Sequence, residues 1–192
     1  MKLKDLMSLP KYKYLLSYRY SEIIFDLTME FCKRFVFEYG QKRTREQMEQ
    51  AARSGKQNII EGIGQSATSK KGEIKLLGVA KGSQEELLAD YEDFLRVGKY
   101  RIWPKSDEKV GRLRHYAFRI SSLSNVSDLG SLNEKPTLPV NPEIAANLLL
   151  TLCHQVTYLL SRQITKAEED FIQKGGFTEN LFKKRIQSRI RE

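Results

Sequence analysis

The residues with the most evident chemical potential lie in the stretch "QAARSGKQNIIEGIGQSA", residues 50–67. At helical spacing, Ser54, Asn58, Glu61 and Gln65 share one flank of an apolar face, so Glu61 could serve as a general base. General-base catalysis also needs a second acid, a nucleophile or a ligand, and none follows at a useful spacing. We therefore favour a hydrogen-bonding seam that fixes helix register or a subunit contact, and we predict no catalytic residue.

The histidines and cysteines do not form the pattern of a metal site. A di-iron bundle needs inward-facing Glu-x-x-His pairs, and neither His115 nor His154 has a Glu three residues before it. Cys32 and Cys153 belong to no CxxC pair, which indicates a reduced, cytoplasmic compartment. We expect a surface position for His154, a buried one for Cys153, no metal, no cofactor and no enzymatic activity.

Charge is the strongest signal in the composition. Lys plus Arg number 33 and Asp plus Glu number 24, and the resulting net charge of +9 favours nucleic acid, an acidic partner or an anionic membrane surface. In the N-terminal "KYKYLLSYRY", Tyr12, Tyr14, Tyr18 and Tyr20 are interleaved with cations, as in single-strand binders. We favour the alternative that this arm packs its tyrosines on the rest of the protein.

Two further basic sets are candidates for binding phosphate, because phosphate contacts need many cations and little specific geometry. One set surrounds the second predicted helix and the turn after it, and the other lies in the C-terminal tail. The candidate nucleic-acid-binding residues are Arg43, Arg45, Arg53, Lys56, Lys70 and Lys71 in the first set, and Lys183, Lys184, Arg185 and Arg189 in the second.

Four segments with a helical period must position these groups. The first covers about 21–38. The second begins at "TREQ", with Thr44 as cap and Gln47 at the capping-box position. The third follows "SATSKKG", and the fourth runs from the cap Asn141 to Gly175. Between the third and fourth, "SDEKVGRLRHYAFRIS" indicates a short helix and "SNVSDLGSLNEKPTLPVN" a loop. No segment alternates with period two for long enough to predict a strand.

The predicted fold is all-α: an antiparallel four-helix bundle with a short extra helix inserted between helices three and four and a short C-terminal helical suffix. The bundle, with its N-terminal arm and an insertion at 101–141, covers residues 1–176, and the basic suffix covers 177–192. Because an isolated helix of the suffix's length is marginal in water, we expect the suffix to dock on something.

Glycines recur inside the second and third predicted helices, including Gly55, Gly62, Gly78 and Gly82. Each interior helical Gly costs about 0.8–1 kcal/mol relative to Ala, and close backbone approach is the usual reason to tolerate it. We therefore expect the two helices to pack tightly, either within the chain or across subunits. The candidate structural or interface residues are Asn58, Glu61, Gly78, Gly82 and Ser83.

The motifs "QAARSGKQNIIEG" and "AKGSQEELLADYEDFL" resemble the bacterial four-helix-bundle family encoded by intervening sequences in large ribosomal RNA genes. Accessory proteins of diversity-generating retroelements are similar, and "KGGFTENLFKKRIQSR" resembles the C-terminal suffix of one subgroup. The resemblance implies a small basic bundle whose relatives can assemble as pentameric rings. In retroelement members it implies binding to nucleic acid and to a reverse transcriptase. Asn58, Glu61, Gly82 and Ser83 match the family motif.

Taken together, these features predict a non-enzymatic, self-associating helical bundle that binds nucleic acid through phosphate contacts. RNA or a nucleoprotein is favoured over a DNA sequence, because no recognition-helix motif is visible. The alternative is a protein-interaction module whose basic face binds an acidic protein. No membrane association is expected: the longest apolar tract, 144–160, is too short and too polar to span a bilayer, and the N-terminus has no signal-peptide pattern.

Overall fold

A computed structural model describes residues 10–121 and 137–190 of the chain. The described residues form helices and no strand, as the sequence predicts. The α-helices are α2 (Leu16–Phe35), α3 (Lys42–Gln65), α4 (Lys70–Val97), α5 (Glu108–Ser121), α6 (Pro142–Lys174) and α7 (Phe177–Ile190). Two short 3-10 helices, η1 (Lys11–Tyr14) and η2 (Tyr39–Gln41), precede α2 and α3.

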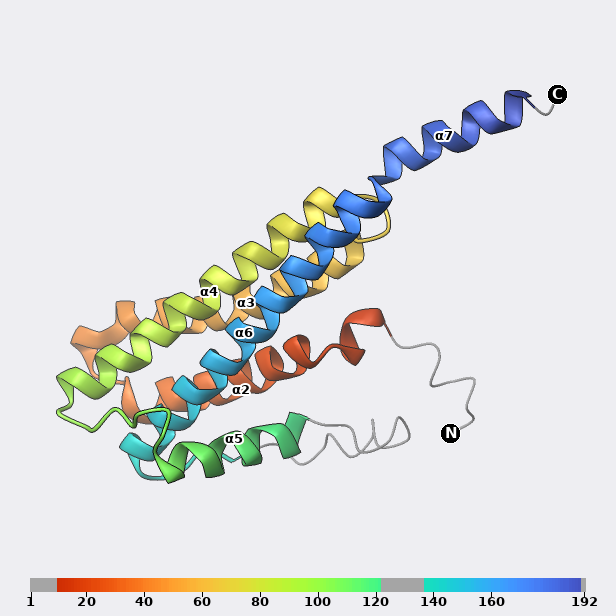
Figure 1. Ribbon diagram of the computed structural model, residues 1–192. Coiled ribbons are helices and arrows are strands. Elements are labelled where there is room, and N and C mark those ends of the chain that lie inside the picture. The colour runs from red at the N-terminus through yellow and green to blue at the C-terminus, as the bar shows by residue number, and fades with distance from the viewer. Residues whose placement is uncertain (1–9, 122–136, 191–192) are drawn as a thin grey trace, which may run out of the picture.

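Five of the helices, α2 to α6, pack together, and α7 continues beyond them (Figure 1). The main contacts join α3 to α4, α4 to α6, α2 to α3 and α2 to α6, while α5 lies on the outside against α6 and α2. Helix α2 runs antiparallel to α6: Ser17 Oγ donates to Gln163 Oε1 at 2.8 Å near one end, and Arg34 Nη1 donates to the carbonyl of Leu138 at 3.2 Å near the other.

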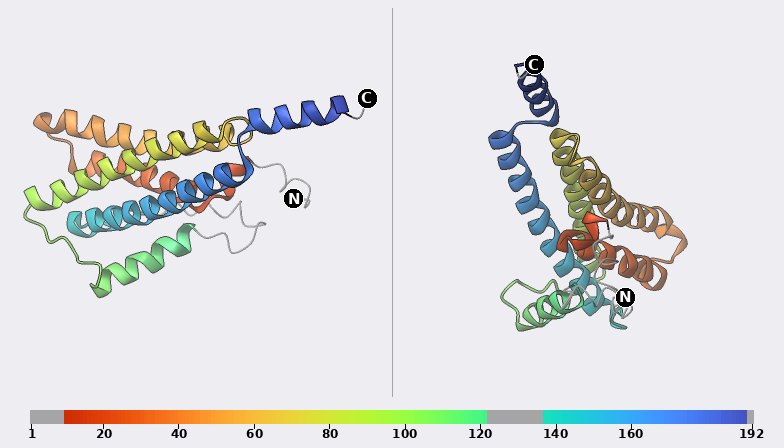
Figure 2. Two further views of the ribbon diagram at one scale, coloured as in Figure 1. Left: turned by 45° about the horizontal axis from the view of Figure 1, so that its top comes forward. Right: turned by 90° about the vertical axis from the view of Figure 1, so that its right-hand side faces the viewer.

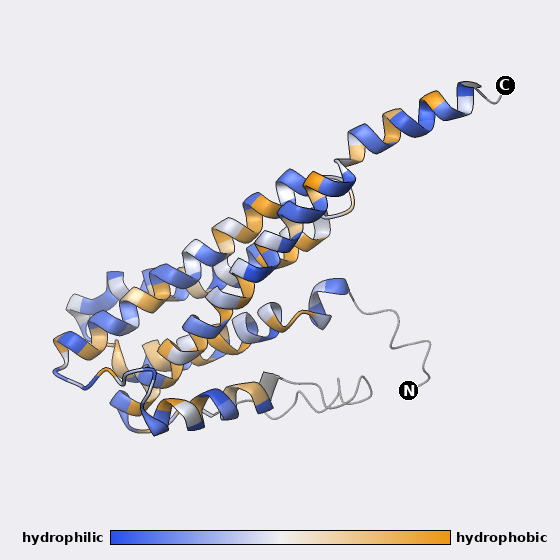
Figure 3. Cartoon of the chain, in the orientation of Figure 1, coloured by the Kyte–Doolittle hydropathy of each residue, from blue (hydrophilic) through white to orange (hydrophobic). Residues whose placement is uncertain are grey.

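Aromatic side chains join α2 and α4 across the core. The Phe31 ring meets the Tyr91 ring edge-on at a centroid distance of 5.1 Å and the Phe94 ring at 4.8 Å. Tyr91 is fully buried, and its hydroxyl is hydrogen-bonded to Thr28 Oγ1 at 2.8 Å, so the polar end of the ring is not left unsatisfied. Figure 3 shows hydrophobic residues recurring along the bundle helices and also along α7, away from the core.

The helix ends agree with the sequence at some positions and differ at others. Asn141 caps α6 by accepting from the amide of Ile144 at 3.0 Å, and Gly175, with a φ of 69°, ends that helix, as predicted. The predicted capping box of Thr44 and Gln47 is wrong. Helix α3 begins at Lys42, directly after η2, so both residues lie inside the helix.

The first helix starts earlier than the predicted position 21. It begins at Leu16 because Tyr18 and Tyr20, read from the sequence as an arm, are buried in the core of the bundle. The extra helix predicted within the 101–141 insertion is α5, whereas most of the loop predicted after it, 122–136, lies outside the described residues.

Helices α3 and α4 approach closely, as expected, but through glycines of α3. A Cβ on Gly62 would lie 3.3 Å from Leu76 Cβ, and one on Gly55 would overlap the side-chain amide of the buried Gln84. By contrast, a Cβ on Gly78 or Gly82 would meet nothing within 4 Å, because both residues lie on the exposed face of α4. Close packing within the chain therefore explains Gly55 and Gly62 of α3 and leaves Gly78 and Gly82 of α4 without a role in the described fold.

Helix α6 contains the most apolar part of the described chain. By length and composition alone, the helical stretch Pro142–Arg189 could cross a membrane, with a mean hydropathy of 1.3 over its most apolar 18-residue window. In the bundle, 61% of that window is buried. Burial of this kind is ordinary for the core helix of a helical bundle, which passes the same test.

The two kinds of glycine should respond in opposite ways to alanine. We expect Gly82→Ala to raise the free energy of unfolding by about 0.8–1 kcal/mol, because the new methyl group enters open space and favours the helix. Gly55→Ala should lower the free energy of unfolding by about 1 kcal/mol, because the buried Gln84 must move. Urea denaturation followed by far-ultraviolet circular dichroism measures both. Equal gains at the two positions would contradict the close packing at Gly55.

Candidate nucleic-acid interface

One end of the bundle gathers cations from three separate elements. The turn between α3 and α4, the end of α6 and the start of α7 enclose a hollow of about 370 Å³. Lys70, Lys174 and Lys184 line it, together with the hydroxyl-bearing Ser66 and Ser69. Two of the predicted basic sets, the residues around Lys70 and those of the C-terminal tail, therefore lie side by side.

Ion pairs neutralise part of the charge around this hollow. Lys70 Nζ lies 2.7 Å from Glu73 Oε2, and Lys174 Nζ lies 2.7 Å from Asp170 Oδ1, which Lys166 also approaches at 3.3 Å. The hydrogen bond from Lys174 is the largest cause of the lowered pKa of Asp170. Lys71 lies over the Phe171 ring at 5.9 Å.

Helix α7 carries cations that no acid balances. Gly175 redirects the chain, and Glu179 accepts from the amide of Gly176 at 3.1 Å, so the only acidic side chain of α7 is used at its start. The helix then projects away from the bundle, as two views show (Figures 1 and 2). Its four cations are exposed and make no ion pair with any described residue: Lys183, Lys184, Arg185 and Arg189.

The apolar side chains of α7 are also exposed. Phe182 is 63% exposed and Leu181 is 54% exposed, and Phe177 and Ile186 are only partly covered. The suffix is helical, as predicted, but in the part of the chain that the structure describes α7 projects beyond the five packed helices instead of docking along them. The helix is therefore an exposed element with cations and large apolar groups on its surface.

The cations of α3 do not form one cluster. Arg43 and Arg45 lie at the start of the 24-residue helix, about 30 Å along its axis from its other end, which leads to Lys70 and Lys71 at the start of α4. Arg45 faces Glu49 at 3.8 Å, and Lys56 lies 3.9 Å from the centre of the Phe25 ring. Of the predicted cations in the middle of α3, Arg53 is exposed and Lys56 is half-buried.

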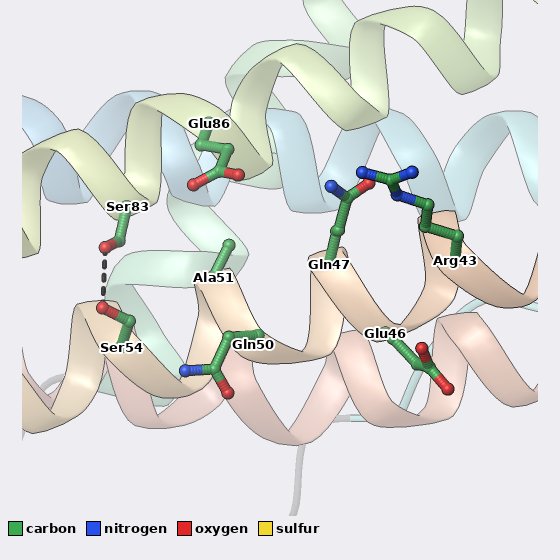
Figure 4. Close-up of a pocket in the computed structure, with 8 residues that line it drawn as sticks. All are labelled: Arg43, Glu46, Gln47, Gln50, Ala51, Ser54, Ser83 and Glu86. Atoms are coloured by element: carbon green, nitrogen blue, oxygen red, sulfur yellow. Dashed lines mark hydrogen bonds between the residues drawn. The ribbon is translucent and has the colours of Figure 1, made fainter.

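A groove between α3 and α4 carries both signs of charge. It has a volume of about 450 Å³, and Figure 4 shows Arg43 with Gln47 and Gln50 along α3, and Glu46 and Glu86 nearby. Because acids flank its single arginine, this groove is a poor place for a phosphate backbone.

The predicted polar seam exists in part. Asn58 Nδ2 donates to the carbonyl of Ser54 at 2.9 Å, and the Ser54 and Ser83 hydroxyls are hydrogen-bonded at 2.9 Å across α3 and α4 (Figure 4). Glu61 is exposed and stands outside this network. The seam is therefore a contact between helices built from Ser54, Asn58 and Ser83.

The N-terminal tyrosines pack on the bundle, as favoured from the sequence. Tyr12 and Tyr18 meet edge-on at 4.7 Å, Tyr18 donates its hydroxyl to Glu22 Oε1 at 2.8 Å, and Tyr20 is buried. Tyr14 is the most exposed of the four, at 40%. The rings of Tyr12, Tyr18 and Tyr20 are thus used in the fold.

Groups that could support catalysis or metal binding are dispersed. No three His, Cys, Asp or Glu side chains gather into a possible metal site among residues 10–121 and 137–190. Cys32 and Cys153 are both buried, as expected for Cys153, and burial raises the pKa of Cys32 to about 12. The thiol form therefore predominates at neutral pH. His154 is exposed, as expected.

Sequence reasoning missed Lys174 as a member of the basic end. Lys166, Asp170 and Lys174 follow one another at intervals of four residues, which indicates a series of ion pairs on the helix surface. Only the folding of α6 against the α3–α4 turn brings Lys174 beside Lys70 and Lys184. Sequence spacing alone does not carry that information.

Comparison with known proteins assigns no relative to this chain: no family model, curated protein or solved structure matches it.

Asp90 on α4 should make the free energy of unfolding depend on pH. Burial, followed by Glu86 and Asp93, raises its pKa from 3.8 to about 6. The folded protein thus holds this proton more tightly than the unfolded chain, so Asp90 lowers the free energy of unfolding as the pH rises from about 4 through 6. We expect Asp90→Asn to raise the free energy of unfolding near pH 7 by about 1 kcal/mol and to change little near pH 4. Denaturation at the two pH values checks this, with Glu61→Gln as the exposed control. The same gain at both pH values would contradict the assignment.

Proposed function

We propose that this protein is a non-enzymatic, self-associating helical bundle that binds nucleic acid, RNA in preference, through phosphate contacts at the end of the bundle that carries α7. The observation that carries the proposal is the set of four exposed and unpaired cations on α7, beside Lys70 at the start of α4 and Lys174 at the end of α6. Unpaired surface cations release counterions when they meet phosphates, and this release supplies most of the affinity of sequence-independent binding.

The proposal includes a finer description of the fold. Helices α2, α3, α4 and α6 would form an antiparallel four-helix bundle, with α5 as the inserted helix and α7 as the suffix. The contacts among the four helices and the antiparallel course of α2 and α6 support this topology. The proposal also includes a cytoplasmic setting without a membrane, which the unpaired cysteines support. It further includes a protein partner such as a reverse transcriptase, which the sequence resemblance supports.

Self-association would use the exposed face of α4. Gly78 and Gly82 lie there with open space beside them, although each weakens the helix. A second helix could approach this face closely, as α4 itself approaches Gly55 and Gly62 of α3. In the alternative function, the basic surface would bind an acidic protein partner, and the glycine-bearing face of α4 would form the contact between subunits.

Neutralising the tail should weaken binding to nucleic acid. We expect Lys183→Gln/Lys184→Gln/Arg185→Gln to reduce the affinity for labelled RNA and to lower the slope of log affinity against log salt by about 2–3. Fluorescence anisotropy with structured RNA, single-stranded RNA and duplex DNA, each at low and physiological salt, measures both quantities and ranks the ligands. Because α7 is exposed, the fold should not change, and circular dichroism checks this.

The matched control is Lys33→Gln/Lys99→Gln/Arg162→Gln, which removes the same charge from exposed positions outside α7 and outside the predicted basic sets. Equal losses in the two triple variants would show that binding depends on net charge and not on α7. Absence of binding even at low salt would overturn the nucleic-acid proposal and favour the acidic protein partner.

A bulky residue on the exposed face of α4 should separate assembly from folding. We expect Gly82→Leu to reduce the molar mass measured by light scattering toward that of a monomer, because its side chain blocks the approach of a second helix. Gly64→Leu on α3 is the matched control, since its position is also exposed with nothing within 4 Å. An unchanged molar mass for Gly82→Leu would place the assembly contact elsewhere.

A further inference from the structure

A second hollow, unrelated to the basic end, lies between α4, α5, α6 and the segment that joins α4 to α5. Its volume is about 310 Å³, at the small end of the range for ligand pockets. Apolar side chains of Ile102, Val110 and Leu150 form part of its lining, and Trp103 lies among them. Thr151 in this hollow is separated from Lys174 at the basic end by about 35 Å along α6.

The wall that contains Trp103 is held rigidly. Asn147 Oδ1 accepts from the backbone amide of Trp103 at 2.9 Å, while Asn147 Nδ2 donates to the carbonyl of Arg101 at 2.9 Å. The indole Nε1 donates to Glu143 Oε1 at 2.9 Å. These bonds fix the joining segment on α6, so the hollow exists before any ligand enters and binding would cost little ordering.

One polar group inside the hollow lacks a partner. Gln155 Oε1 is buried and has no hydrogen-bond partner, whereas the neighbouring Thr151 hydroxyl donates to the carbonyl of Asn147 at 2.7 Å. An unsatisfied buried acceptor is unfavourable, and a ligand that brings an N–H group would satisfy it once the Gln155 amide turns toward the hollow. The Gln155 amide also carries donor hydrogens, and an amide that donates and accepts is the group that pairs with the edge of a nucleobase.

The remaining groups suit an aromatic ring with an anion attached. Tyr158, 62% exposed, lies at the hollow as a stacking surface. Lys105 and Arg114 line the same hollow. Partial burial of the His154 ring, together with the charge of Lys105, lowers the pKa of His154, so this neighbouring side chain is neutral at pH 7. Two cations against the single acid Glu92 leave a net positive site for a phosphate.

We infer that this hollow binds a nucleotide, with the base edge on the Gln155 amide, the ring on Tyr158 and the phosphate on Lys105 and Arg114. The nucleotide could be free in solution or be an unpaired nucleotide of a strand, since both present the same chemistry. The inference does not rest on the proposed function, because none of these residues belongs to α7 or to the α3–α4 turn.

Trp103 provides a direct readout, because it is the only tryptophan of the chain and lines the hollow. The full-length protein is titrated with adenosine monophosphate, adenosine, inorganic phosphate and a short single-stranded oligonucleotide, with excitation where the bases do not absorb. We expect a saturable change in Trp103 emission with the mononucleotide, a weaker one with adenosine and none with phosphate. A response to the oligonucleotide alone would identify a strand as the source of the nucleotide.

Substitutions of Gln155, whose Oε1 has no hydrogen-bond partner, and of the exposed Tyr158 test the site without unfolding the protein. We expect Gln155→Leu to weaken nucleotide binding by at least about tenfold, and Tyr158→Ser to weaken it by a similar factor. Gln173→Leu, an exposed position farther along α6, should leave binding unchanged. No saturable change with either nucleotide ligand, an equal response to phosphate alone, or unchanged binding in Gln155→Leu would overturn the inference. The triple variant of α7 should retain this site, so failure here is distinguishable from failure of RNA binding at the basic end.

Discussion

The close approach of α3 and α4 is the constraint on which the rest of the structure depends. It needs positions without side chains at Gly55 and Gly62, and the space left over Gly55 is filled by the Gln84 side chain. At this separation the short Ser54 and Ser83 side chains reach each other directly. Once the two helices are fixed in this register, Gly78 and Gly82 must face outward.

The same register determines how charge is distributed. The antiparallel pair of α3 and α4 places its turn at the end where α6 stops and α7 begins, so lysines from three elements meet there. At the other end, Asn147 holds the joining segment on α6 and forms the hollow beside Trp103. Along the flank between them, a groove is lined by Arg43 and by the acids Glu46 and Glu86. The hollow at the basic end and the hollow beside Trp103 thus lie at opposite ends of the bundle.

Helical periodicity predicted the main helices, because each buries one apolar stripe, and local hydrogen bonding predicted the ends of α6 at Asn141 and Gly175. The start of α2 was missed because polar-looking tyrosines bury their rings and satisfy their hydroxyls, as Tyr18 does on Glu22. The glycines in the sequence predicted a close contact between helices. Which of these glycines make the contact depends on which faces of α3 and α4 meet. The cations of α7 were visible in the sequence, whereas the place of Lys174 beside them depends on tertiary packing.

In the proposed function, the turn at Gly175, where φ is 69°, makes α7 and the lysines at its base the two parts of a bivalent binder. It joins α7, about 21 Å long by its 14 residues, to the bundle through two glycines, so α7 and the lysines at its base are tethered at a fixed short separation. Once either part holds a polyanion, contact by the other becomes intramolecular, and its effective concentration is in the millimolar range typical of short linkers. Individually weak contacts can then add up to slow release, and severing the chain at Gly175 would cost more avidity than the loss of either contact alone suggests.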